Sequence, residues 1–255
     1  MIKEAIRQYL RTCGKEVMEV RTAMFDMDGV LFDSMKNHAS CWHLTMEHFG
    51  FTFPEWEAYL HEGRTGSGTI NIVSRRERGH DATTEECEAM YRYKSRLFDS
   101  CPEPERMPGA YELLCKVKSS GITPLVVTGS GQKVLLSRLN KNFPDIFRQE
   151  LMVTAYDVKK GKPDAEPYLM GLHKGGSFLN GDHSPLLPHQ SIVIENAPLG
   201  IQAGVAAGVF TIAVNTGPLP DQTLFDSGAD LLFPSMQSLC DNWEELLYAL
   251  QNTTP

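Results

Sequence analysis

Short runs of apolar residues alternate with amphipathic stretches along most of the chain. Six runs are rich in β-branched and other apolar side chains, and we expect each to form a buried strand. They are VRTAMFDM (20–27), ITPLVVTG (122–129), LMVTAYDV (151–158), SIVIEN (191–196), VFTIAVNT (209–216) and ADLLFPS (229–235). Because helical patterns separate these runs, we expect a doubly wound α/β fold, a mostly parallel sheet with helices on both faces. In such a sheet ligands bind at the carboxyl ends of the strands.

Helical patterns fill the intervals between the strands. The predicted helices span 108–121, 131–143, 165–176, 198–208 and 238–251, and an amphipathic helix is expected at about residues 1–19. Residues 175–190 are rich in Gly, Pro and Asn, so we expect an irregular surface loop there.

One long segment, residues 35–106, has no strand pattern. It predicts four helices at 35–50, 54–63, 68–79 and 83–100, and Thr83 with Glu86 forms a capping-box pattern at the start of the last. We therefore expect two domains, an α/β core of residues 1–34 and 107–255 and a helical domain inserted at 35–106.

Composition narrows the classes of partner. The net charge of the 255-residue chain is −8, which disfavours binding to nucleic acid or to an anionic membrane. No apolar run approaches the roughly 20 residues that span a bilayer, and the N-terminus lacks the apolar stretch of a signal peptide. The six cysteines are scattered without a CxxC pair, so we expect reduced thiols, a cytoplasmic location and no zinc site. The expected oligomeric state is a monomer.

Two carboxylates leave the first strand together. Asp26 and Asp28 point to the same side of an extended backbone, because side chains alternate with a period of two. They would repel each other unless a cation sits between them, and Mg²⁺ prefers hard oxygen ligands such as these. The alternative is that the aspartates cap a loop or helix.

Other strand ends carry further polar groups. Thr128 ends its strand, and a hydroxyl followed by free amides at a helix start forms an anion site; the residues that follow are Gly129, Ser130 and Gly131. Lys162 lies in a turn between a glycine and a proline, and Glu195 and Asn196 end the fourth strand. Each signal alone is weak. Together, at one edge of one sheet, they predict a site for phosphate and magnesium.

Four motifs occur in a characteristic order: FDMDGVLFDS, VVTGS, GKPDAEPY and VIENAPLGIQAG. With these motifs, the chain after residue 20 resembles the haloacid dehalogenase-like superfamily. The inserted helices resemble the cap of its beta-phosphoglucomutase-like subgroup. The resemblance implies a Rossmann-like core with a helical cap, dependence on Mg²⁺ and a phosphoaspartyl intermediate.

The resemblance also implies a role for each motif residue. Asp26 is the expected nucleophile and Asp28 the expected general acid and base. Thr128 and Lys162 are expected to hold the transferring phosphoryl group. The expected Mg²⁺ ligands are the Asp26 carboxylate, Asp28 through its backbone carbonyl, Glu195 and Asn196. The expected substrate-binding residues are His38, Gly63, Arg64, Thr65, Gly129 and Ser130.

The cap loop HEGRTGSGT bears on the reaction. The mutase has a lysine before the glycine of this loop and an arginine three residues after it, whereas this chain has Glu62 and Gly66. The altered pattern favours a phosphatase acting on a small sugar phosphate. The alternatives are a beta-phosphoglucomutase and, outside enzymes, a degenerate phosphosugar-binding protein. An imine-forming phosphonoacetaldehyde hydrolase, with Lys36 or Lys94 as its lysine, is disfavoured.

Asn196 departs from the subgroup, which usually has an aspartate that ligates Mg²⁺ at this position. An amide oxygen is still a hard ligand but lacks a full charge, so weaker Mg²⁺ binding is expected. Asn196→Asp is then expected to lower the Mg²⁺ concentration needed for activity. The alternative role for the amide is a hydrogen bond to a ligand or a loop.

Overall fold

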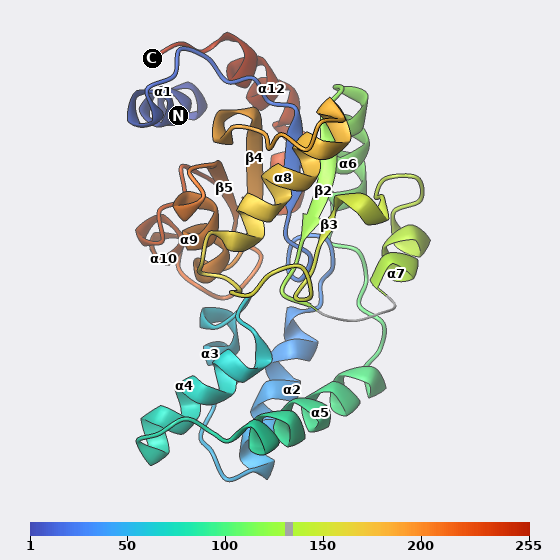
Figure 1. Cartoon of the computed structure of the whole chain (residues 1–255), viewed down its shortest axis with the longest axis vertical. Helices are drawn as coiled ribbons and strands as arrows, with labels where there is room; N and C mark the ends of the chain where they lie inside the picture. The colour runs from blue at the N-terminus through green and yellow to red at the C-terminus, as the bar shows by residue number, and fades with distance from the viewer. Residues whose placement is uncertain (131–134) are drawn as a thin grey trace.

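A parallel sheet runs through the larger part of the computed structural model, which describes residues 1–130 and 135–255 (Figure 1). Within these residues the sheet has six strands in the order β3-β2-β1-β4-β5-β6, and every neighbouring pair is parallel. The strands are β1 Thr22–Phe25, β2 Thr123–Val127, β3 Met152–Val153, β4 Ser191–Glu195, β5 Phe210–Val214 and β6 Leu231–Phe233. The predicted α/β sheet is confirmed.

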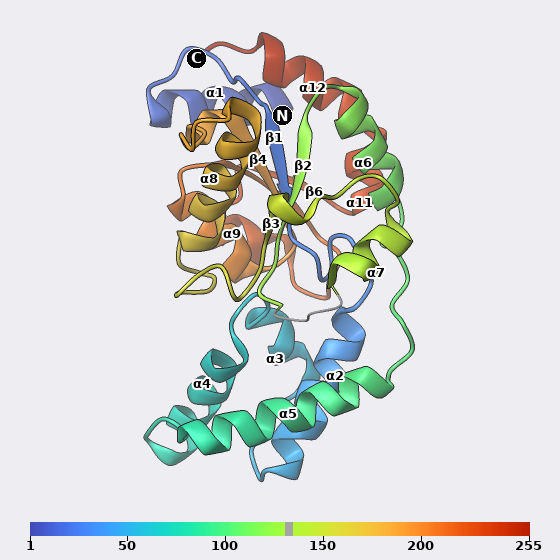
Figure 2. The same ribbon diagram turned by 45° about the vertical axis from the view of Figure 1, so that its right-hand side comes forward.

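Helices cover both faces of the sheet, as Figure 2 shows. On one face, α8 Glu166–Asn180 and α9 Pro198–Ala206 bury an apolar cluster against the strands, with α10 Asp221–Asp226 beside α9. The other face carries a larger apolar cluster, and the helices that contribute to it are α1 Ile2–Cys13, α6 Ala110–Ser119, α7 Leu135–Asn142, α11 Met236–Asp241 and α12 Trp243–Asn252. Burial of apolar area on both faces fixes the sheet in the middle layer.

Several predicted boundaries differ from the structure. The strand expected at 151–158 ends at Val153, because the Asp157 carboxylate accepts hydrogen bonds from the Thr154 backbone and hydroxyl at 2.7 and 2.8 Å and turns the chain. The helix expected at 238–251 is split into α11 and α12. For the helix expected at 131–143 the structure describes α7 from Leu135, and residues 131–134, including Gly131, lie outside the described residues.

The loop expected at 175–190 is wrong in its first part, since α8 continues through Gly175 and Gly176 to Asn180. A Cβ on Gly176 would lie 2.0 Å from the carbonyl oxygen of Ser184. The two glycines are therefore needed for the close return of the chain against the helix, and they do not end it.

Four helices form a separate layer beyond the carboxyl ends of the strands (Figures 1 and 2). They are α2 Met35–His48, α3 Glu55–Leu60, α4 Gly66–Arg78 and α5 Thr84–Ser100. Their apolar side chains pack on one another in a cluster of their own, and Thr83 and Glu86 form the predicted capping box at the start of α5. We refer to residues 35–106 as the helical module.

Two further features concern the chain as a whole. Among the described residues, no helix combines the length and the apolar character that crossing a bilayer requires. The six cysteines, all of them described, are free thiols, and the closest sulfur atoms, in Cys41 and Cys101, lie 3.6 Å apart.

Candidate active site

The carboxyl ends of three adjacent strands bring the motif residues to one edge of the sheet. Asp26 follows β1, and its backbone N–H still pairs with Ile194 of β4 at 3.0 Å. Thr128 follows β2, and Glu195 is the last residue of β4. Because β1 lies between β2 and β4, three sequence-distant segments end side by side. The predicted convergence of strand ends is what the structure shows.

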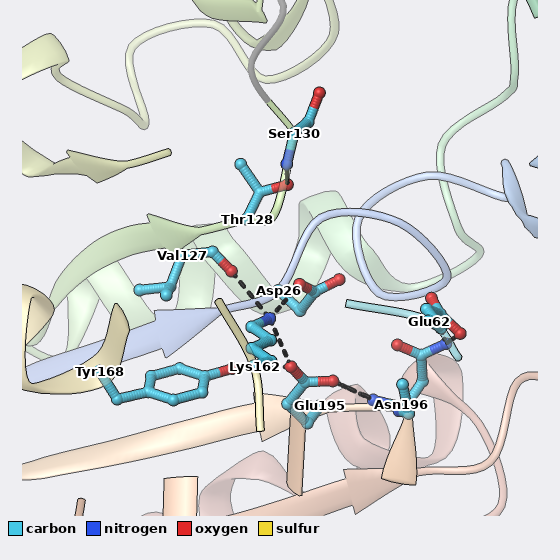
Figure 3. A network of polar contacts seen from close by, with 10 residues as sticks. Asp26, Glu62, Val127, Thr128, Ser130, Lys162, Tyr168, Glu195 and Asn196 are labelled. Atoms are coloured by element: carbon cyan, nitrogen blue, oxygen red, sulfur yellow. Dashed lines mark hydrogen bonds and ion pairs between the residues drawn. The ribbon is translucent and has the colours of Figure 1, made fainter. Parts of the chain in front are cut away.

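Lys162 joins all three of these strand ends in the buried network of Figure 3. Its ammonium group is paired with Oδ1 of Asp26, with Oε1 of Glu195 at 2.6 Å and with the Val127 carbonyl at 3.1 Å. The side chain of Lys162 is only 1% exposed. The second oxygen of Asp26 points away from Lys162 (Figure 3), so it remains able to contact another group.

Burial and charge shape the protonation of this network. Burial raises the pKa of Asp26 to about 7, with Glu195 and Asp28 adding to the effect and Lys162 opposing it. For Lys162, burial acts to lower the pKa, but the adjacent carboxylates outweigh it and raise the pKa. Lys162 is therefore a permanent cation between two carboxyl groups.

Glu195 has no free acceptor position in this arrangement. Oε1 accepts from Lys162 and from the Tyr168 hydroxyl at 2.8 Å, and Oε2 accepts from the backbone N–H groups of Asn196 and Ala197 at 3.0 and 3.3 Å. A carboxylate offers about four lone-pair positions, and all four are engaged. The geometry thus presents Glu195 as a group that positions Lys162, and its expected role as a metal ligand stays a prediction.

Asp28 lies on the other side of the pocket and contacts the helical module. Its Oδ1 accepts a hydrogen bond from the Ser34 hydroxyl at 2.6 Å and lies 3.2 Å from Nε2 of His38. Nδ1 of His38 is in turn 2.7 Å from the ammonium nitrogen of Lys94. Since an ammonium group can only donate, Nδ1 is the acceptor, and Nε2–H donates to Asp28.

These contacts set the resting state of Asp28. Burial acts to raise its pKa, but the interactions with His38 and Ser34 outweigh it and lower the pKa. Burial and the nearby Lys94 lower the pKa of His38, which keeps the imidazole neutral. Asp28 therefore rests as a carboxylate that receives two hydrogen bonds, in the form required of a base.

The end of β2 supplies the predicted donors. The Ser130 backbone N–H donates to Oγ1 of Thr128 at 3.0 Å, which leaves the hydroxyl hydrogen of Thr128 free to bind an anionic oxygen. Thr128, Gly129 and Ser130 all line the pocket that Asp26 and Asp28 also line.

The loop between α3 and α4, residues 61–65, lies directly over this edge. A Cβ on Gly129 would lie 3.0 Å from the Gly63 carbonyl oxygen, and one on Gly63 would lie 2.9 Å from Cδ of Lys162. A Cβ on Gly161 would likewise lie 3.0 Å from Thr65. Contacts this close require glycine, so the motif glycines accommodate the loop of the helical module.

Most predicted substrate-binding residues reach the pocket. His38, Gly63 and Arg64 line it together with Gly129 and Ser130. Thr65 lines a smaller adjacent pocket with Thr128 and Lys162, and its hydroxyl caps α4 by accepting from the Gly68 backbone N–H at 3.2 Å. The structure therefore gives Thr65 a structural contact, and its role in binding substrate stays a prediction.

Three groups at the site are not among the site residues expected from the sequence. Glu62 is 8% exposed, and both of its carboxylate oxygens lie 3.1 Å from Nδ2 of Asn196. The sequence offers Lys94 only as an imine-forming lysine, and it gives no role to Ser34. Ser34 could have been found from its place six residues after Asp28 in the first motif. Glu62 and Lys94 are brought to the site by tertiary packing, which leaves no periodic signal.

The donor set fits a hard divalent cation. Oδ1 of Asn196 is buried and has no hydrogen-bond partner among the described residues, and it is turned away from Glu62, on the side of Asp26 (Figure 3). A buried carbonyl oxygen without a partner is costly and points to a ligand, and Mg²⁺ takes such oxygens. The described residues hold no group of three or more His, Cys, Asp or Glu side chains able to bind a metal.

Comparison with known proteins places the chain. Residues 23–214 match the family model described as haloacid dehalogenase-like hydrolase. The chain belongs to this family. Haloacid dehalogenase-like membership agrees with the order of the four motifs at the sheet edge, and it suggests a divalent metal.

One solved structure and two phosphatases are similar to this chain. A solved structure from Bacteroides vulgatus, provisionally assigned as a beta-phosphoglucomutase, is 61% identical, covers 98% of each chain and superposes with a TM-score of 0.92. Hexitol phosphatase A of Escherichia coli is 29% identical over 87% of this chain and 94% of its own length. Glycerol-1-phosphate phosphohydrolase 2 of Saccharomyces cerevisiae is 28% identical over 87% of this chain and 85% of its own length.

Proposed function

We propose that this protein hydrolyses a small phosphate monoester, a sugar or polyol phosphate, through a phosphoaspartyl intermediate on Asp26. The observation that carries the proposal is the pairing of Lys162 with one oxygen of Asp26 while the other points away from it. Similarity to a hexitol phosphatase and a glycerol-1-phosphate phosphohydrolase supports the substrate class. The helical module of residues 35–106 acts as a lid that excludes water and macromolecules.

In the first step, the second oxygen of Asp26 attacks phosphorus and the bond to the leaving oxygen breaks. Lys162 offsets the repulsion between the carboxylate and the phosphoryl group, and one phosphoryl oxygen accepts a hydrogen bond from the Thr128 hydroxyl. The leaving oxygen takes a proton from Asp28. Lys94 gives a proton to Nδ1 of His38, and Nε2 of His38 passes one to Asp28, so that the acid form of Asp28 is supplied.

In the second step, Asp28 as carboxylate takes a proton from water, whose oxygen attacks phosphorus and releases Asp26. Mg²⁺ is the proposed cation, and the Asp26 carboxylate, the Asp28 backbone carbonyl and Oδ1 of Asn196 would hold it. When bound, it neutralises charge on the phosphoryl oxygens. Glu195 contributes through Lys162 and the Asn196 backbone.

A second candidate is the beta-phosphoglucomutase reaction. Arg64 lines the pocket, and its Nε is buried without a partner among the described residues, so it is a cation available to a second phosphate. The provisional assignment of the Bacteroides vulgatus protein favours the same reaction. Against it, Glu62 lines the same pocket at the position where the mutase has a lysine, so that cation is not available to a second phosphate. A phosphate-release screen over sugar and polyol phosphates, run beside a beta-glucose 1-phosphate isomerisation assay, separates the two.

The nucleophile is tested with Asp26→Asn and the matched control Asp33→Asn, an exposed aspartate of the same motif. Loss of the nucleophile is expected to lower phosphate release by at least about a thousandfold, with the control unchanged. Rapid-quench trapping should show ³²P on the wild-type chain and none on Asp26→Asn. Retention of most of the activity by Asp26→Asn would overturn the assignment.

Cellular location and oligomeric state complete the proposal. We propose a cytoplasmic protein, supported by the free thiols, and a monomer. Light scattering of the purified chain gives its mass directly, and a value of twice 28.5 kDa would exclude the monomer.

A further inference from the structure

Glu62 and Asn196 form the one contact in which a carboxylate of the helical module reaches a candidate metal ligand of the core, within the described residues. The two positions are 134 residues apart, and they are 8% and 7% exposed. We infer that Glu62 is a positioning residue that turns the Asn196 oxygen toward the cation, so that cation binding and closure of the helical module favour each other. The inference rests on the cation site of the proposed function.

The contact settles which way the amide faces. Both oxygens of Glu62 lie 3.1 Å from Nδ2 of Asn196, and a carboxylate accepts hydrogen bonds, so the amide nitrogen is the correct atom on that side. Oδ1 must then face the other way, which is the side of Asp26 in Figure 3. This oxygen is the buried atom without a partner, so Glu62 holds in place the single donor that the core leaves open.

The same contact increases the donor strength of the amide. Donation from Nδ2 to a carboxylate draws electron density through the amide toward Oδ1, which makes the oxygen a better ligand. Burial and the nearby Asp26 raise the pKa of Glu62 well above its usual range, so Glu62 acts through this hydrogen bond and not through a full negative charge. It polarises the amide without occupying a coordination position.

The effect of Glu62 on Asn196 depends on where the loop that carries Glu62 lies. Glu62 belongs to residues 61–65, which lie over the sheet edge through Gly63 against Lys162 and Gly129. Gly29 allows Glu62 and Asn196 to approach each other, because a Cβ there would lie 2.1 Å from Nδ2 of Asn196 and 3.2 Å from Glu62. If the helical module lifts, Glu62 leaves and Asn196 loses its orientation. Linkage then requires that a bound cation strengthen closure by the same factor.

Cation binding is measured with Mn²⁺, whose free ion is read directly by electron paramagnetic resonance, on the full chain without substrate. Glu62→Gln keeps the shape but leaves one acceptor oxygen where the carboxyl group has two, and it is expected to weaken Mn²⁺ binding about 10-fold. Glu55→Gln, an exposed position at the start of α3, is the matched control and should bind as wild type. A dissociation constant for Glu62→Gln equal to that of wild type overturns the inference.

Closure is measured separately by small-angle X-ray scattering with and without Mg²⁺. The cation should reduce the radius of gyration of wild type and of Glu55→Gln, and change that of Glu62→Gln less. Equal compaction in all three overturns the coupling. If wild type binds no Mn²⁺, the cation site of the proposed function fails; if wild type binds it and Glu62→Gln binds equally, only this inference fails.

Asn196→Asp supplies a test that does not depend on losing a group. Opposite Glu62, an aspartate places two carboxyl groups in contact. Without cation the chain should therefore expand, and the variant should bind Mn²⁺ only slightly more tightly than wild type. In the Glu62→Gln background the new aspartate meets an amide donor, and Mn²⁺ should bind about 10-fold more tightly than to Glu62→Gln alone. Equal effects of Asn196→Asp in both backgrounds would contradict the inference. The inference requires that the tighter cation binding expected from the sequence for Asn196→Asp depend on Glu62.

Discussion

Two groups of side chains face each other across one pocket and are held in different ways. The sheet-edge cluster, Asp26, Lys162 and Glu195, is almost completely buried and bonded within the core. The module cluster, His38, Lys94 and Glu62, reaches the core through Asp28 and Asn196. The sheet-edge cluster thus belongs to the fold itself, whereas the module cluster works only while the helical module is seated.

This difference separates two kinds of damage. Removing a charge from the sheet-edge cluster leaves buried partners unpaired whatever the helical module does, so both stability and activity should fall. Removing a group from the module cluster should leave the core intact and change proton transfer or closure. Paired measurements of unfolding and of phosphate release therefore distinguish the two clusters.

The largest effect is expected for Lys162→Met. It leaves the carboxyl groups of Asp26 and Glu195 buried without their cation, which should cost about 3 to 5 kcal/mol of unfolding free energy in urea and abolish phosphate release. Lys160→Met, on the exposed side of the same turn, is the matched control and should alter neither. A stable Lys162→Met chain would mean that the sheet-edge cluster does not support the fold.

An intermediate effect is expected for His38→Asn. The imidazole that bridges Lys94 and Asp28 is lost, so kcat should fall about 100-fold while the urea midpoint changes little. His48→Asn, exposed near the end of the same helix, is the control. Steady-state kinetics over a range of pH check the result, because loss of proton supply to Asp28 should alter the pH profile. An unchanged profile would remove His38 from the relay.

The smallest effect is expected for Gly63→Ala. Both Gly63 and Gly79 have a positive φ, so alanine at either should cost about 1 to 2 kcal/mol of stability. Only at Gly63 would the new Cβ meet Lys162, at 2.9 Å; at Gly79 it meets no described atom within 4 Å. We expect about a 10-fold loss of kcat/KM for Gly63→Ala alone. Equal kinetics for the two variants would show that the seat of the loop does not matter.

The same contrast explains how far sequence reasoning reached. Asp26, Thr128, Glu195 and Asn196 were placed correctly at one edge because each ends a strand whose apolar pattern is plain, and parallel strands share their carboxyl ends. The engagement of all four acceptor positions of Glu195 was not foreseen, since it depends on where the Tyr168 hydroxyl lands.

The contacts of the helical module could not be predicted in this way. Glu62 lies in a loop without periodicity, and its partner is fixed only by how the module packs on the core. The amide of Asn196 was given a loop contact as one of two roles, and the structure shows that contact; its role as a metal ligand stays a prediction. Gly175 and Gly176 led to the wrong prediction of a loop where α8 continues, because glycine occurs at sites of close packing as well as in turns.

The central position of β1 has a consequence for how the chain acquires its fold. β1 is the first strand along the chain, yet its neighbours on the two sides are β2, about 100 residues later, and β4, which begins at Ser191. During synthesis β1 emerges before either of the strands that pair with it. A growing chain that ends before Ser191 leaves one side of β1 unpaired and lacks Glu195 and Asn196 of the site. The site is therefore completed late in folding, and the recovery of phosphate release on refolding should lag behind the recovery of helical signal.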